Sequence, residues 1–140
     1  MRERLPASCR LDVDVDPHLP PVLADGERLV TALINLLDNA VKYSPGEQHI
    51  TIAAQRAGES MVAFAVTDTG IGIAPREQRR IFQRFYRVDQ RLSRETSGVG
   101  LGLSIVELIA RGHGGGVTVR SQPGAGSTFT LTVRRAGAAV

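Results

Sequence analysis

The chain has 140 residues, enough for one domain with a substantial hydrophobic core. Apolar residues make up 42% of it and charged residues 22%, as in an ordinary globular protein, and no apolar run approaches the length of about 18 residues that a membrane span requires. The net charge of +3 mildly favours anionic partners, and the single cysteine, Cys9, excludes an internal disulfide.

Residues 10–16 (RLDVDVD) alternate apolar and acidic side chains and predict a half-buried strand. Leu11, Val13 and Val15 are expected to face the core, and the three aspartates to face solvent. A calcium loop has a glycine turn among its acidic ligands, which this stretch lacks, so we interpret the aspartates as surface residues. A short extended piece, 22–24, follows a proline-flanked connection.

Residues 25–43 (DGERLVTALINLLDNAVKY) have apolar side chains at helical spacing over a broad face, with Asp25 as the predicted N-cap. Asn35, Asn39 and Lys42 are spaced i, i+4 and i+7, so they share one stripe of this helix. Asparagine is unfavourable inside helices, while amide oxygens are suitable Mg²⁺ ligands when phosphates and water supply the rest. The stripe is therefore either a site for a magnesium-bound phosphate or an ordinary solvated face.

The rest of the chain alternates hairpins with helices. In chain order, we predict strands at 49–56 and 61–68, a helix at 75–81, an irregular segment at 82–97, a helix at 103–113, and strands at 117–121 and 127–134. This order predicts an α+β fold, a two-layer α/β sandwich, rather than a sheet of repeated parallel βαβ units. We expect one domain over 1–140, with frayed ends at 1–9 and 135–140.

Two glycine loops carry further chemical signals. The first, DTGIGI at 68–73, follows a strand, so the Asp68 carboxylate lies at the mouth of the core, where it can accept a hydrogen bond from the exocyclic amine of adenine. A β-turn aspartate with two turn glycines is the alternative. The second, GVGLGLSIV at 98–106, leads into a helix N-terminus that suits an anion, although a plain glycine-rich helix entry is equally open.

The segment between these loops, 76–94, contains seven arginines opposed by only two acidic residues. Aromatic residues are interleaved with the arginines. This composition fits a mobile cover over phosphate oxygens, because lids are often irregular segments hinged at glycines. A nucleic-acid surface is the other interpretation.

The order of the motifs is more specific than any one of them. It runs Asn-x-x-x-Asn-Ala-x-Lys-Tyr, DTGIGI, IFQRFYR, GVGLGL and GAGSTF, and it covers residues from about Asp25 to Thr130. This series resembles the N box, first glycine box, F box, second glycine box and third glycine box of sensor histidine kinases. The resemblance implies the Bergerat fold, a mixed sheet of about five strands covered by about three helices.

The resemblance also implies a set of site residues, with ATP and Mg²⁺ as cofactors. Asn39 is expected to be the main Mg²⁺ ligand, Asn35 to help it, and Lys42 to touch phosphate, which makes these three the expected catalytic residues. Asp68 is expected to bind the adenine amine. The other expected contacts are Tyr43 along the adenine, Gly70, Gly72 and Ile73 in the base pocket, Arg84 and Arg87 at the phosphates, Gly98, Gly100, Leu101, Gly102 and Leu103 over the triphosphate, and Thr128 near the adenine.

The implied function is that of an enzyme, the catalytic domain of a protein histidine kinase. It would transfer the γ-phosphoryl group of ATP to a histidine on a separate dimerisation domain that is absent from this chain. His18, His49 and His113 have no adjacent acidic residue, so we interpret all three as structural or surface residues. ATPases of the same superfamily place a glutamate at the Asn35 position to activate water, and an amide is a poor base.

The expected partners are the dimerisation domain and a downstream response regulator, with no nucleic acid and no direct membrane contact. The expected location is cytoplasmic, including the cytoplasmic end of a membrane-bound sensor. Ser97 and Val99 depart from the glycine and threonine of many family members. Two other functions remain open: a non-catalytic or anti-sigma-type regulatory ATP-binding module, and a nucleic-acid binder that uses the arginine segment.

Overall fold

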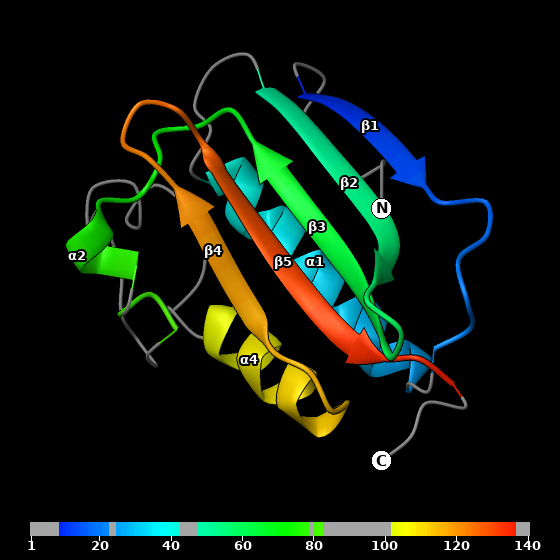
Figure 1. Ribbon diagram of the computed structural model, residues 1–140. Helices are drawn as coiled ribbons and strands as arrows, with labels where there is room; N and C mark the ends of the chain where they lie inside the picture. The colour runs from blue at the N-terminus through cyan, green and yellow to red at the C-terminus, as the bar shows by residue number, and fades with distance from the viewer. Residues whose placement is uncertain (1–8, 23–24, 43–47, 79, 83–101, 137–140) are drawn as a thin grey trace.

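The computed structural model describes residues 9–22, 25–42, 48–78, 80–82 and 102–136, which form a five-stranded sheet with helices on one face (Figure 1). The strands are β1 (Cys9–Val15), β2 (Gln48–Ala57), β3 (Met61–Asp68), β4 (Val117–Ser121) and β5 (Ser127–Arg134). The helices are α1 (Gly26–Lys42), α2 (Pro75–Gln78) and α4 (Gly102–Gly112). The predicted α+β class with about five strands and three helices is therefore confirmed.

The sheet is mixed, with the strand order β1-β2-β3-β5-β4. Strands β1 and β2 pair in parallel across the α1 connection, while the remaining pairs, β2–β3, β3–β5 and β5–β4, are antiparallel. Both predicted hairpins are present. The parallel pair arises because a helix separates β1 from β2 in the chain, and such a crossover returns the second strand in the same direction.

Helices α1 and α4 pack beside each other on one face of the sheet (Figure 1). The buried side of α1 consists of Ala32, Leu36, Leu37 and Ala40, and that of α4 of Val106, Ile109 and Ala110. Opposite them, alternate residues of β5 (Phe129, Leu131 and Val133) are at most 1% exposed. Burying side chains of this size contributes about 1.5–3 kcal/mol each, so this layer is the main source of stability.

The start of α1 is fixed by its own cap and by α4. The Asp25 carboxylate accepts hydrogen bonds from the backbone N–H groups of Glu27 (3.1 Å) and Arg28 (3.2 Å), as predicted for an N-cap. The N–H of Asp25 donates to Nε2 of His113 (3.0 Å), whose Nδ1 donates to the carbonyl of Ile109 (2.7 Å). Because Nε2 accepts, Nδ1 carries the proton, and the ring joins the two helices.

Strand β1 differs from its prediction in the exposure of its apolar residues. Leu11 packs against the core, but Val13 is 53% exposed and Val15 is 52% exposed. The prediction that Val13 and Val15 face the core is therefore wrong. The reason is position: β1 is an edge strand of the sheet, while α1 packs on β2 and β3 and α4 on β4 and β5 (Figure 1).

The outer side of β1 carries an ion pair. Oδ2 of Asp12 lies 2.6 Å from Nε2 of His49 and 3.6 Å from Nε of Arg10. The hydrogen bond from His49, helped by the charge of Arg10, lowers the pKa of Asp12 below its ordinary value. His49 is thus a surface residue of β2, as predicted.

Two boundaries also differ from the predictions. Helix α2 ends at Gln78 rather than at the predicted residue 81, and residues 80–82 form a turn in which the N–H groups of Arg80 and Ile81 both donate to the carbonyl of Glu77. The expected fraying from Arg135 is not seen at the first residues of the tail. Arg135 donates its N–H to the carbonyl of Ser60, and Ala136 donates to Pro21.

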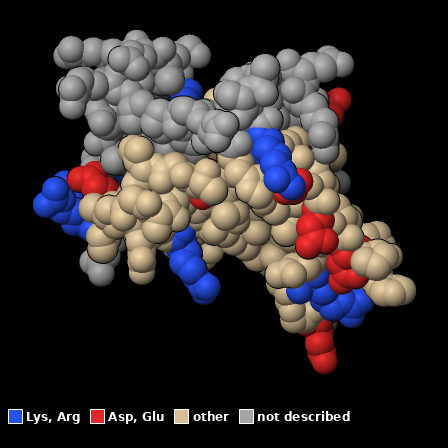
Figure 2. Space-filling view, turned by 90° about the horizontal axis from the view of Figure 1, so that it is seen from above, with Lys and Arg blue, Asp and Glu red and all other residues tan. Residues whose placement is uncertain are grey.

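The surface has charges of both signs. On the face seen in Figure 2, the Lys and Arg side chains of the described residues are scattered, most of them beside Asp or Glu side chains, rather than gathered in one continuous stripe. Among the described helices, none combines the length and the apolar character that a membrane crossing needs.

Candidate nucleotide site

The stripe of α1 that carries the predicted magnesium ligands meets the start of α4 at Asn35. Asn35, Asn39 and Lys42 are all half-buried. A methyl group added to Gly102 would lie 3.5 Å from Oδ1 of Asn35, so the amide of Asn35 sits against the first residue of α4. The fold therefore brings the N box and the second glycine box together, although they are far apart in the chain. At 3.5 Å the added methyl group would be in ordinary van der Waals contact with the amide, so this approach does not by itself require a glycine.

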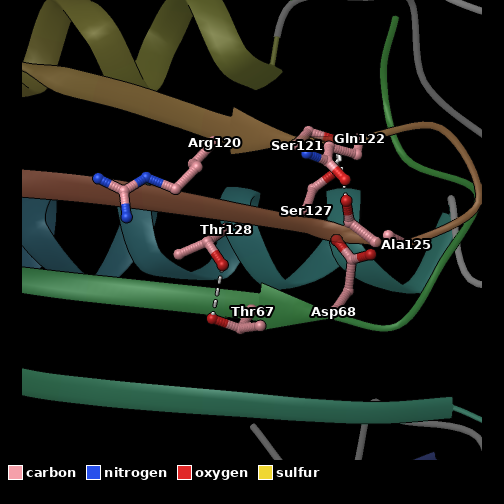
Figure 3. A pocket seen from close by; sticks show the side chains of 9 residues that line it. Thr67, Asp68, Arg120, Ser121, Gln122, Ala125, Ser127 and Thr128 are labelled. Atoms are coloured by element: carbon pink, nitrogen blue, oxygen red, sulfur yellow. Dashed lines mark hydrogen bonds between the residues drawn. The ribbon is translucent and has the colours of Figure 1, made fainter.

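Asp68 is one of the few buried polar residues in the described part of the chain. It ends β3, is 4% exposed, and accepts a hydrogen bond on Oδ1 from the N–H of Gly70 (2.8 Å). Its neighbour in the sheet is Ser127 of β5, which is 7% exposed. Figure 3 shows the two side chains together at the end of the sheet. A buried carboxylate with one oxygen held by a backbone N–H is well oriented to accept a hydrogen bond from a ligand.

The DTGIGI loop is locked against the turn between β4 and β5. Gly72 has a φ of +74°, and a Cβ added there would lie 1.9 Å from the carbonyl oxygen of Gln122. The N–H of Gly124 donates to the carbonyl of Ile71 (2.7 Å). The first and third glycine boxes are thus in backbone contact, which explains why both need glycine.

The structure brings most of the described site residues into two groups. Asn35 meets Gly102 at the junction of α1 and α4, with Asn39 and Lys42 on the same stripe and Leu103 packed on the core. The second group is the loop that begins at Asp68 and contains Gly70, Gly72 and Ile73. The contacts that these residues make with a ligand remain predictions.

The side chain of Thr128 lies on the opposite face of the sheet from α1 and α4 (Figure 3). Its hydroxyl lies 3.0 Å from that of Thr67, on the face of the sheet that α1 and α4 leave open (Figure 3). A shallow hollow of about 310 Å³ is lined by both Thr128 and Asp68, so Thr128 lies near the start of the DTGIGI loop. The residue paired with Asp68 is Ser127, which the sequence reasoning missed. The strand alternation could have indicated it, because Ser127 is two residues before Phe129 and therefore lies on the same buried face of β5.

Several predicted contacts lie outside the described residues. They are Tyr43, Arg84, Arg87, Gly98, Gly100 and Leu101. They remain predictions.

Comparison with known proteins identifies the family. Residues 24–137 match the family described as histidine kinase-, DNA gyrase B- and HSP90-like ATPase. The sensor-like histidine kinase SenX3 of Mycobacterium tuberculosis is 48% identical over 130 residues, which is 91% of this chain and 32% of that protein. The adaptive-response sensory kinase SasA of Nostoc sp. is 40% identical over 124 residues, 89% of this chain and 30% of that protein. The chain thus spans about a third of the length of these relatives.

Solved structures agree with this match. The mycobacterial sensor histidine kinase MprB has a TM-score of 0.80 at 30% identity, covering 96% of this chain and 87% of that one. Full-length ShkA, solved in complex with AMPPNP, has a TM-score of 0.78 at 34% identity, covering 94% of this chain and 27% of that one. The chain belongs to the family of histidine kinase-, DNA gyrase B- and HSP90-like ATPases, and within it to the nucleotide-binding catalytic domains of sensor histidine kinases.

Proposed function

We propose that this domain binds Mg·ATP between α1, α4 and the DTGIGI loop and presents the γ-phosphoryl group to a histidine of a separate dimerisation domain. The observation that best supports this is the contact between the amide of Asn35 and Gly102, within a match to an ATPase family over residues 24–137. This contact, at the N-terminus of α4, supports a metal-bound phosphate at the junction of the two helices.

The residues at the two ends of the site have different tasks. Asp68 is buried at the sheet end and accepts a hydrogen bond from the exocyclic amine of adenine, because its carboxylate is already oriented by the N–H of Gly70. At the other end, the first N–H groups of α4 and its positive dipole end attract phosphate oxygens. Lys42, on the same stripe as the two asparagines, adds a positive charge for the phosphates.

The donor set fits magnesium. Asn35 and Asn39 offer neutral, hard oxygen atoms. This suits Mg²⁺, which keeps several waters and takes further oxygens from phosphates. When bound, Mg²⁺ neutralises phosphate charge and orients the triphosphate. We assign Asn39 as its main protein ligand and Asn35 as a helper.

The described part of the site favours phosphoryl transfer over hydrolysis. An amide at position 35 is a poor general base, so it does not activate water as a carboxylate would. His49 pairs with Asp12, and the ring of His113 is hydrogen-bonded at both nitrogens, so neither is placed as a phosphoacceptor. The acceptor histidine then comes from another domain.

The partners follow from this assignment. The relatives are sensor kinases about three times as long as this chain, which supports a dimerisation domain in the same protein and a response regulator downstream. Because ATP is a cytoplasmic substrate, we place the domain in the cytoplasm.

Calorimetric titration with a non-hydrolysable ATP analogue tests the proposal. With Mg²⁺, Asn39→Ala is expected to lower the affinity at least about tenfold, and without Mg²⁺ to change it little, because the amide acts on the metal. Thr31→Ala is the matched control: Thr31 lies on the same helix, and its exposed hydroxyl donates to the carbonyl of Glu27. An Asn39→Ala variant that keeps the full affinity and the full Mg²⁺ dependence removes Asn39 from the metal site.

A further inference from the structure

One residue of the base-binding loop is held from two sides. The N–H of Ile73 donates to Oγ of Ser121 on β4 (2.7 Å), and the carbonyl of Ile73 accepts from Nε2 of Gln78 on α2 (2.9 Å). The same Nε2 also donates to the carbonyl of Ser121 (3.0 Å). The loop, the helix α2 that follows it after one residue, and the distant end of β4 therefore meet at Ile73.

The hydroxyl of Ser121 takes part in three hydrogen bonds, one of which is the bond from Ile73. It donates to the carbonyl of Gly126 (2.8 Å), so the hydroxyl of Ser127, 2.8 Å away, donates to Ser121 (Figure 3). Ser127 is the sheet neighbour of Asp68. The hydrogen bonds thus run from Gln78 through Ile73 and Ser121 to the residue beside the base-binding carboxylate.

The amide of Gln78 is suited to this arrangement by its chemistry. Its NH₂ group supplies two donors, and both are aimed at carbonyl oxygens, those of Ile73 and Ser121. Ile73 is only 5% exposed, so its backbone groups have little access to water if these partners are lost. A buried backbone group without a partner is costly, and the loop would then move to recover hydrogen bonds.

We propose that Gln78 and Ser121 are positioning residues that set the nucleotide-base selectivity of this domain. By holding Ile73 from both sides, they keep the loop from Asp68 to Ile73 in the shape that accepts adenine and rejects guanine. This inference rests on the proposed function, because it assigns the loop to the base of ATP.

The experiment compares the affinities of the chain for AMP-PNP and GMP-PNP, both with Mg²⁺, by calorimetry. Gln78→Glu keeps the shape of the side chain but replaces the donors with carboxylate oxygens that face two carbonyls. We expect the preference for AMP-PNP to fall about tenfold, the loss expected when a hydrogen bond that fixes the loop becomes a repulsion. A lower folded fraction alone lowers the apparent affinity for both nucleotides by the same factor and leaves the ratio of the two affinities unchanged.

Gln122→Glu is the matched control, because Gln122 lies on the adjacent turn with an exposed side chain and the substitution adds the same charge. Ser121→Ala and Ser121→Thr provide a second test. The alanine variant is expected to lose the preference for AMP-PNP, and the threonine variant, which keeps the hydroxyl, to retain it.

The outcomes separate the two proposals. A wild-type chain that binds no AMP-PNP overturns the proposed function and this inference with it. A wild-type chain that prefers AMP-PNP, with Gln78→Glu and Ser121→Ala keeping the same preference, overturns the positioning role alone.

Discussion

Gly72 and Gly58 have the same backbone conformation, with φ of +74° at each, but very different surroundings. A Cβ added to Gly58 meets nothing within 4 Å, whereas one added to Gly72 would lie 1.9 Å from the carbonyl oxygen of Gln122. At the residue scale, the first glycine is required only by its turn. The second is required by the contact between the two glycine boxes as well.

This pair gives a prediction about stability. Gly58→Ala is expected to lower the free energy of unfolding by about 1 kcal/mol, the cost of a left-handed conformation for an L-residue. Gly72→Ala adds a collision with a backbone oxygen, and we expect a loss of about 3 kcal/mol or more. Urea denaturation of the two variants measures the difference. Equal losses would contradict the contact between the DTGIGI loop and the β4–β5 turn.

At the scale of elements, α1 and α4 are joined by more than apolar packing. The ring of His113 accepts from the N–H of Asp25 at the start of α1 and donates to the carbonyl of Ile109 in α4. The ring therefore joins the two helices that carry the proposed metal ligands and the proposed phosphate-binding end, at the ends opposite the contact of Asn35 with Gly102.

Removing the ring tests this connection. His113→Ala is expected to lower the free energy of unfolding by about 1–2 kcal/mol, because one helix-capping N–H loses its acceptor. His18→Ala is the control, since the ring of His18 is exposed, and its effect is expected to stay within about 0.5 kcal/mol. Thermal or urea denaturation measures both. A His113→Ala variant as stable as His18→Ala would show that packing alone joins the helices.

At the scale of the whole molecule, the chain corresponds to about a third of its sensor-kinase relatives. At the proposed site, position 35 carries an amide, which is a poor general base, and the proposed acceptor histidine belongs to a separate domain. We therefore expect the chain alone to bind ATP and to hydrolyse it very slowly.

The measurement is phosphate release from the isolated chain, followed by transfer of labelled phosphate after a dimerisation domain with its histidine is added. Labelled histidine supports the kinase function. Rapid release by the isolated chain favours an ATPase, and nucleotide binding without any labelled histidine favours a regulatory module.

Local pattern was enough to predict most of the elements. The periodicity of residues 25–43 predicted α1 and placed Asn35, Asn39 and Lys42 on one stripe, and the alternation in β3 and β5 predicted their strands. The five ordered motifs identified the family. These features depend on neighbours in the chain, which is why the sequence alone determined them.

Only the tertiary structure decided which surfaces are covered and which distant residues meet. The alternation of β1 predicted buried valines, but Val13 and Val15 are exposed, because the described helices pack on the other four strands and leave this edge strand uncovered. The contacts of Asn35 with Gly102, and of Gln78 with Ser121, join segments that have no sequence relation. A sequence pattern records which face of an element is apolar, whereas the partner of that face depends on how the whole chain packs.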